Sequence, residues 1–134
     1  MNIPEFPTST PTPTLSAGER AARLTLPASG PVSVLIDTDT NNEVDDQFAL
    51  TFALLSQRLT VDALYATQYT HPEGPTTEEG LELSYREIHT ILDKLQLDRN
   101  PPVLRGNTRT VTADPGQSSP AVSDLISRVC NAAD

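Results

Sequence analysis

The spacing of hydrophobic residues changes repeatedly after residue 30 and marks alternating strands and helices. Short apolar runs rich in β-branched residues predict three strands, at 32–36, 61–67 and 102–105. Between and after these runs, apolar residues recur three or four positions apart, as they do on one face of a helix. Strand and helix alternate three times. The sequence therefore predicts an α/β fold, a parallel sheet with helices on its faces.

The three predicted helices are marked by their first residues. Asn42 can cap the first, expected over 43–59. Thr76 and Glu79 form a capping box for the second, and Ser119, followed by a proline, can cap the third. The apolar stripes expected to lie on one face are Val44, Phe48, Phe52, Leu55 and Leu59 in the first helix, Leu81, Tyr85, Ile88, Leu92 and Leu95 in the second, and Val122, Leu125, Ile126, Val129 and Ala133 in the third.

Composition separates the first thirty residues from the rest. Six of the twelve prolines lie at or before Pro31, and the segment 1–14 alternates proline with threonine and serine. This composition predicts a disordered arm over 1–30. Residues 31–134 then form the folded part, which is long enough for one modest core.

The formal net charge of −9 argues against nucleic acid and anionic membrane surfaces as partners. Lys94 is the only lysine. The one cysteine, Cys130, is expected in the core, and no cysteine or histidine pair has the spacing of zinc ligands. The chain shows neither a secretory signal nor a long apolar segment, so a cytoplasmic protein is the default expectation.

Five carboxylates lie within ten residues directly after the first predicted strand. They are Asp37, Asp39, Glu43, Asp45 and Asp46. Carboxylates this close repel one another, and a cation or a proton offsets the repulsion. The last three also suit the first turn of a helix, where the helix dipole stabilises acids. Asp37 and Asp39 have no such explanation, and the cluster therefore predicts a metal or catalytic site.

An EF-hand loop is one alternative for this cluster, because Asp37, Asp39 and Asn41 match its first, third and fifth positions. The match then ends. Asn42 stands where the loop needs glycine, and Phe48 where it needs glutamate. A strand, moreover, is predicted before the cluster, where an EF-hand has a helix.

A phosphohydrolase of the haloacid-dehalogenase type is another alternative, because an apolar strand that runs into Asp-x-Asp resembles its nucleophile motif. Asp37 would then be the nucleophile. That family expects threonine or valine where Asn41 stands, and a later lysine that Lys94, within a predicted helix, does not obviously supply.

A third family fits better. The run Asp37-Thr38-Asp39, followed by Asp45-Asp46-Gln47-Phe48-Ala49-Leu50, resembles the calcium-binding signature of the inosine/uridine-preferring nucleoside hydrolases. The spacer from Thr40 to Val44 is similar to that of a branch with Asn-Glu before the second acidic pair. Further stretches agree with this resemblance, which extends from Val34 onward: DALYA at 62–66, GLELSYREI at 80–88, PVLRG at 102–106 and SPAV at 119–122.

The resemblance implies a calcium-dependent hydrolase of ribonucleosides, in which calcium holds a water and both ribose hydroxyls. Asp39 would be the general base and a calcium ligand, and Asp46 a second ligand. Asp45 would accept a hydrogen bond from a ribose hydroxyl, and Asp37 and Asn42 would support the loop. Carboxylates also suit the positive charge that develops on the sugar as the base leaves.

In one loop this chain departs from the family. Family members commonly place an asparagine that contacts ribose just after the second strand, whereas this chain offers Gln68, Thr70 and His71. We take His71 as the candidate for substrate binding. The alternative is that His71 is a solvated surface residue, as a lone loop histidine more often is.

Family members are more than twice as long as the predicted folded part. The resemblance therefore implies the amino-terminal part of a nucleoside hydrolase-like domain, truncated after the third β-α unit and inactive by itself. A non-catalytic remnant or interaction module is the alternative. An uncovered sheet edge would pair with other chains, so a homo-oligomer is a further expectation.

Overall fold

A computed structural model describes residues 15–25, 28–110, 116 and 118–131. The chain divides into two compact units, Met1–Gly30 and Pro31–Asp134. The first unit contains α1 (Ala17–Arg23), within the segment for which the sequence predicted a disordered arm. A capping box between Ser16 and Glu19 starts α1, none of whose residues is buried. Local hydrogen bonds therefore hold this helix, and residues 1–14 lie outside the described part.

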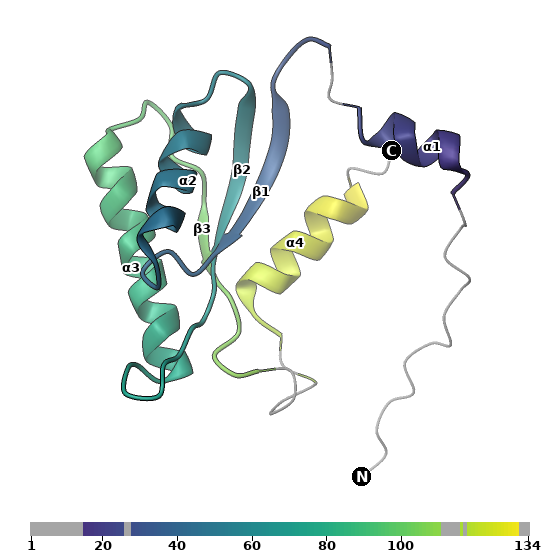
Figure 1. The fold of residues 1–134 in the computed structure, drawn as a ribbon. Coiled ribbons are helices and arrows are strands. Elements are labelled where there is room, and N and C mark those ends of the chain that lie inside the picture. The colour runs from purple at the N-terminus through teal and green to yellow at the C-terminus, as the bar shows by residue number, and fades with distance from the viewer. Residues whose placement is uncertain (1–14, 26–27, 111–115, 117, 132–134) are drawn as a thin grey trace. The chain divides into compact units, whose positions relative to one another are not determined.

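The second unit is built on a three-stranded parallel sheet, with strand order β1-β2-β3 (Figure 1). The strands are β1 (Val32–Thr38), β2 (Leu59–Ala66) and β3 (Val103–Arg105). The central strand, β2, ends in four consecutive buried residues. The predicted parallel α/β fold is confirmed.

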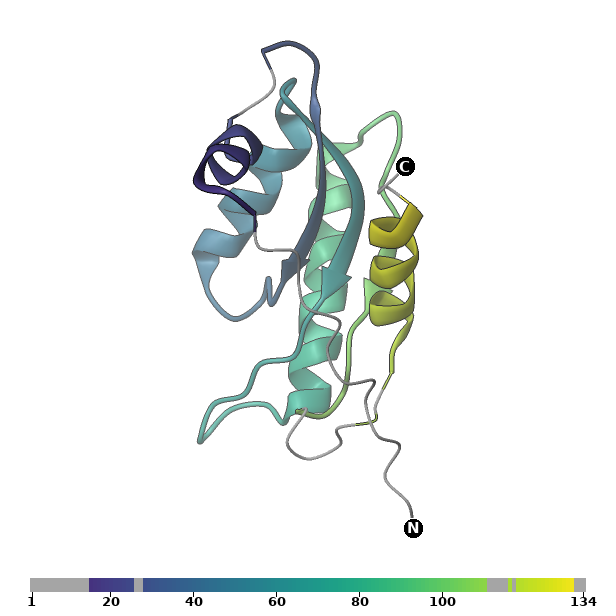
Figure 2. The same cartoon turned by 90° about the vertical axis from the view of Figure 1, so that its right-hand side faces the viewer.

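Helices cover both faces of this sheet. α2 (Val44–Leu55) and α3 (Thr77–Leu95) lie on one face, and α4 (Pro120–Asn131) lies on the other (Figures 1 and 2). Within the described residues, no helix is both long and apolar enough to cross a membrane.

Each face of the sheet has its own core. The larger core lies beneath α2 and α3, and it contains Leu50, Leu64, Ala66, Leu81, Ile88, Ile91 and Leu92. The smaller lies beneath α4 and contains Ala63, Tyr65 and Ala121. Because successive side chains of β2 point to opposite faces, this one strand contributes to both cores.

The second predicted helix agrees closely with α3. The Thr76 hydroxyl accepts a hydrogen bond from the Glu79 amide, and the Glu79 carboxylate accepts one from the Thr76 amide, which completes the predicted capping box. Three residues of the predicted stripe, Leu81, Ile88 and Leu92, are buried. Local capping and burial here specify the same helix.

The prediction of the first helix was wrong in three respects: the residue at which the helix ends, the residue that caps it and the face that is buried. α2 ends at Leu55, because the chain becomes extended at Ser56 to enter β2, and Leu59 belongs to that strand. Glu43 takes the N-cap position that was expected of Asn42, and its side chain makes no capping hydrogen bond. Leu50 and Ala53 face the sheet, whereas the predicted stripe is exposed. The exposed residues are Val44, Phe48, Phe52 and Leu55.

On the other face of the sheet, α4 begins as predicted, with the Ser119 hydroxyl accepting a hydrogen bond from the Val122 amide. Its buried residue, however, is Ala121, and most of the predicted stripe stays exposed. Cys130, expected in the core, is exposed as well, because α4 turns that position away from the sheet. Ala133 lies outside the described residues. The exposed stripe residues are Leu125, Ile126 and Val129.

Gly80 allows α3 to pack closely on the loop after β2. A Cβ atom at this buried position would collide with the main-chain oxygen of Tyr69. We expect Gly80→Ala to destabilise the fold by about 2–3 kcal/mol. Thermal unfolding followed by circular dichroism should show a fall in Tm of roughly 10–20 °C.

Gly18→Ala is the matched control, because the nearest atom to a Cβ there is the Ser16 Oγ at 4.0 Å. It should leave the Tm unchanged. Equal Tm values for Gly80→Ala and the unmodified protein would contradict the close contact between α3 and the Tyr69 backbone.

Candidate functional site

The acidic cluster lies at the carboxyl end of β1, where ligands of parallel α/β sheets commonly bind. Asp37 is still part of β1, one residue further than the predicted strand end. Asp39 lies in the loop that follows, and Asp45 and Asp46 lie in the first turn of α2. The turn between strand and helix therefore brings these residues to one edge of the sheet.

Two buried threonines hold Asp46 in place. The Thr38 hydroxyl donates to the Asp46 Oδ1 over 2.9 Å, and the Thr38 and Thr40 hydroxyl oxygens are also 2.9 Å apart. Because Thr38 has one hydroxyl hydrogen, Thr40 is the donor to Thr38 while Asp46 is ionised. These two hydrogen bonds orient the carboxylate of Asp46, whereas Asp45 is exposed to solvent.

Hydrogen bonds join the loop that contains Asp39 to the loop between β2 and α3. Asn42 donates its side-chain amide to the Asp39 Oδ2 over 2.9 Å, and the Asn42 Oδ1 lies 2.7 Å from the His71 Nε2. Beside this pair, the Tyr69 hydroxyl donates to the Asn41 Oδ1 over 2.8 Å. His71 is exposed, and its hydrogen bond to Asn42 connects it indirectly to Asp39.

The three acids nearest the end of β1 affect one another. Loss of hydration raises the pKa of Asp46, and the charges of Asp39 and Asp45 raise it further, against the opposing hydrogen bond from Thr38. Loss of hydration also raises the pKa of Asp37, because protein atoms surround part of this otherwise exposed residue, and the charge of Asp39 adds to the effect. The repulsion between carboxylates expected from the sequence is therefore present, and the charge of Asp39 acts on both Asp37 and Asp46.

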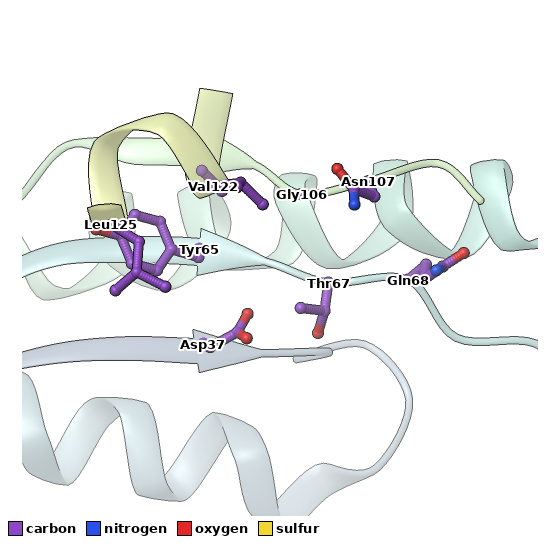
Figure 3. A pocket seen from close by; sticks show the side chains of 9 residues that line it. Asp37, Tyr65, Thr67, Gln68, Gly106, Asn107, Val122 and Leu125 are labelled. Carbon is purple, nitrogen blue, oxygen red and sulfur yellow. The ribbon is translucent and has the colours of Figure 1, made fainter. Parts of the chain in front are cut away.

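Asp37 also lines a pocket of about 200 Å³ between the strand ends and α4 (Figure 3). Gln68 and Asn107 line the same pocket, and Figure 3 shows them on the segments that follow β2 and β3. The Gln68 Oε1 and the Asn107 Oδ1 are buried without a hydrogen-bond partner within the described residues. These two buried oxygens are therefore unsatisfied acceptors beside the pocket.

Two carboxylates are brought together where a metal was predicted. Asp39 and Asp46 interact, whereas no group of three or more acids, histidines or cysteines suited to a metal occurs in the described part of the chain. Their oxygen atoms suit calcium in kind, but calcium takes about 6–8 ligands. This pair is at most part of a calcium site.

Sequence analysis missed Thr38, Thr40 and Tyr69. The strand alternation offered a signal for the first two, because Thr38 and Thr40 alternate with Asp37 and Asp39 and such residues lie on opposite sides of a strand. The Tyr69 contact had no signal in the sequence, since Tyr69 and Asn41 come from different loops and meet only after β1 and β2 pair.

Replacing Asp46 by asparagine should make the protein more stable at pH 7. An acid whose pKa is raised on folding favours the folded state in its protonated form, and this contribution is lost as the pH rises through the folded pKa. Asparagine resembles the protonated form at every pH. We expect Asp46→Asn to gain about 0.5 kcal/mol at pH 7, or roughly 2–4 °C in Tm, and to lose the gain below the unfolded pKa of about 3.9.

Asp98→Asn, at an exposed position after the end of α3, is the control, and it should show no such gain at any pH. Thermal unfolding between pH 3 and pH 8, without divalent cations, measures the difference. A lower Tm for Asp46→Asn than for the unmodified protein at pH 7 would contradict the prediction. It would show that the hydrogen bond from Thr38 to the ionised Asp46 stabilises the fold more than the repulsion from Asp39 destabilises it.

Comparison of the chain with models of protein families, with curated proteins and with solved structures found no match. The resemblance to the nucleoside hydrolases therefore stays a prediction from the motif at 37–50. The function has to be argued from the chemistry of the residues at the end of β1.

Proposed function

We propose that this chain is the amino-terminal part of a calcium-dependent nucleoside hydrolase, which hydrolyses the N-glycosidic bond of ribonucleosides. The observation that carries the proposal is that Asp39 and Asp46 both lie at the carboxyl end of β1, close enough for the charge of Asp39 to act on Asp46. Each carboxylate is oriented by its own partner, Asp46 by Thr38 and Asp39 by Asn42. Two oriented carboxylates with unbalanced charge are what a hard cation binds.

Calcium would supply positive charge that lowers the pKa of a bound water and aligns the ribose hydroxyls. Asp39 would accept the proton of that water, and Asp45, exposed on the first turn of α2, would accept a hydrogen bond from a ribose hydroxyl. Asp37, Gln68 and Asn107 line the adjacent pocket, and their polar side chains suit the hydroxyl groups of a sugar. His71 would position Asn42, and through it Asp39, more directly than it would contact the sugar.

The shortage of ligands favours a second candidate for the isolated chain. With two neighbouring carboxylates, Asp39 and Asp46, the described residues provide fewer oxygen ligands than calcium takes. The chain would then bind calcium weakly and release no ribose, as a non-catalytic module. In the complete hydrolase the remaining ligands and the groups that activate the leaving base would come from a continuation of the fold.

Calcium binding is the first test. If the dissociation constant is on the order of 1 mM, 10 mM calcium should stabilise the chain by about 1.4 kcal/mol, because calcium binds only the folded state. Asp39→Asn removes a ligand charge and should abolish this gain. Asp93→Asn is the matched control and should retain it, and an equal Tm with and without calcium in the unmodified chain would contradict the metal site.

Hydrolysis is the second test. The longest in-frame product that contains this chain should release ribose from inosine or uridine in the presence of calcium, and a chelator should stop the reaction. Asp39→Asn should lower kcat by roughly 100-fold to 10,000-fold, the usual contribution of a general base. Ribose release that continues unchanged in Asp39→Asn would exclude the assigned role, and magnesium-dependent phosphatase activity lost in Asp37→Asn would favour the dehalogenase alternative.

A further inference from the structure

Two side chains of the loop after β2 hold the loop that carries Asp39. The Tyr69 hydroxyl donates to the Asn41 Oδ1 over 2.8 Å, and the His71 Nε2 lies 2.7 Å from the Asn42 Oδ1. Asn42 donates its side-chain amide to Asp39, so its oxygen faces His71, and the His71 Nε2 has to carry the donated hydrogen. Two inter-loop hydrogen bonds therefore act within three residues of Asp39.

The loop after β2 is itself fixed, so it can hold the other loop in place. The main chain of Tyr69 lies directly against the first turn of α3. The Thr70 hydroxyl donates to the Pro75 oxygen over 2.9 Å, and the Gly74 amide donates to the His71 oxygen over 3.1 Å. The rings of Tyr69 and His71 also meet edge to face, with 5.9 Å between their centres. Side chains on a loop that is already ordered bind their partners at a smaller cost in entropy.

The Asp39 loop needs such support, because its acids repel one another. The charge of Asp39 acts on both Asp37 and Asp46. Without a cation, this repulsion favours movement of Asp39 away from the end of β1. Within the loop, the Asn42 amide donates to the Asp39 main-chain oxygen over 2.7 Å and closes a turn. The two inter-loop hydrogen bonds oppose opening of this turn from outside the loop.

The groups that hold the loop leave its negative charge in place. The Tyr69 hydroxyl and the Asn42 amide are uncharged donors, so they orient their partners without neutralising a carboxylate. Loss of hydration, together with the charge of Asp39, raises the pKa of Tyr69, so its hydroxyl stays protonated and remains a donor at neutral pH. A cation would therefore meet acids that are already placed and still negative.

We propose that Tyr69 and His71 are positioning residues, which hold the Asp39 loop in its cation-binding shape before a cation binds. His71 acts through Asn42 on the Asp39 carboxylate, and Tyr69 acts through Asn41 on the loop. The link to calcium rests on the proposed hydrolase function, whereas the ordering of the loop does not. An apparent dissociation constant rises as the fraction of molecules in the binding-competent shape falls. Loss of either inter-loop hydrogen bond should therefore weaken calcium binding.

Amide hydrogen exchange, followed by nuclear magnetic resonance without calcium, tests the ordering of the loop. The Asn42 amide reports on the turn, because it bonds to the Asp39 oxygen. Tyr69→Phe removes the hydroxyl and His71→Leu removes the ring donor, and each should raise the exchange rate at Asn42 about threefold or more. His71→Gln keeps an N–H donor and should retain the slow exchange of the unmodified chain. Unchanged exchange in Tyr69→Phe or His71→Leu would exclude the positioning role of that residue.

Tyr65→Phe is the matched control, because it also removes a tyrosine hydroxyl hydrogen bond of 2.8 Å, in this case to Asp124 on α4. It should lower the Tm and leave exchange at Asn42 unchanged. This control separates local opening of the loop from a general loss of stability. If Tyr65→Phe raised exchange at Asn42 as much as Tyr69→Phe does, the effect would be global and the proposal would be wrong.

Titration with calcium, followed by the same amide signals, tests the consequence for the site. Tyr69→Phe and His71→Leu should each raise the dissociation constant roughly three- to tenfold, whereas His71→Gln and Tyr65→Phe should not change it. Because His71 acts through Asn42, His71→Leu should have no further effect in an Asn42→Ala background. A further loss in that background, or faster exchange with an unchanged dissociation constant, would overturn the proposal. An unmodified chain that binds no calcium would instead exclude the proposed metal site, and the exchange rates would still decide whether Tyr69 and His71 order the loop.

Discussion

The parallel pairing of β1 with β2 determines where every candidate functional group of this protein lies. The hydrogen bonds of this pairing extend one residue beyond the end of β2, where the Thr67 amide donates to the Thr38 oxygen. The segment after β1 and the loop after β2 therefore start side by side, and contacts such as that between Tyr69 and Asn41 follow. Without this pairing Asn41 and Asn42 would lack their partners in the loop after β2, Tyr69 and His71.

Opposing demands meet at the end of β1. The main-chain oxygen of Thr38 accepts a hydrogen bond from the Thr67 amide, which extends the sheet. The Thr38 hydroxyl donates to the Asp46 carboxylate and so holds it in place. Asp39 is held nearby by Asn42, so two like charges are kept at short range. Such an arrangement costs stability in the absence of a counter-ion, and functional sites commonly carry costs of this kind.

α2 and α4 bury little of their apolar surface, unlike α3. Phe48 and Phe52 on α2 are 71% and 73% exposed, and α4 leaves Ile126 and Val129 exposed on the other face. Within the described residues the sheet is three strands wide, and these side chains point away from it.

The sequence by itself determined the three strands and the starts of α3 and α4, because their signals are local. Capping residues fixed the start of α3 and α4, and short apolar runs fixed the three strands. It also located the acidic cluster at a strand end. The tertiary structure decided which face of α2 is buried, because apolar residues lie on opposite sides of that helix and only its position over β2 selects Leu50 and Ala53. It likewise decided which residues meet the Asp39 loop, since the hydrogen bonds of Asn41 with Tyr69 and of Asn42 with His71 join separate loops and depend on strand pairing that no local pattern encodes.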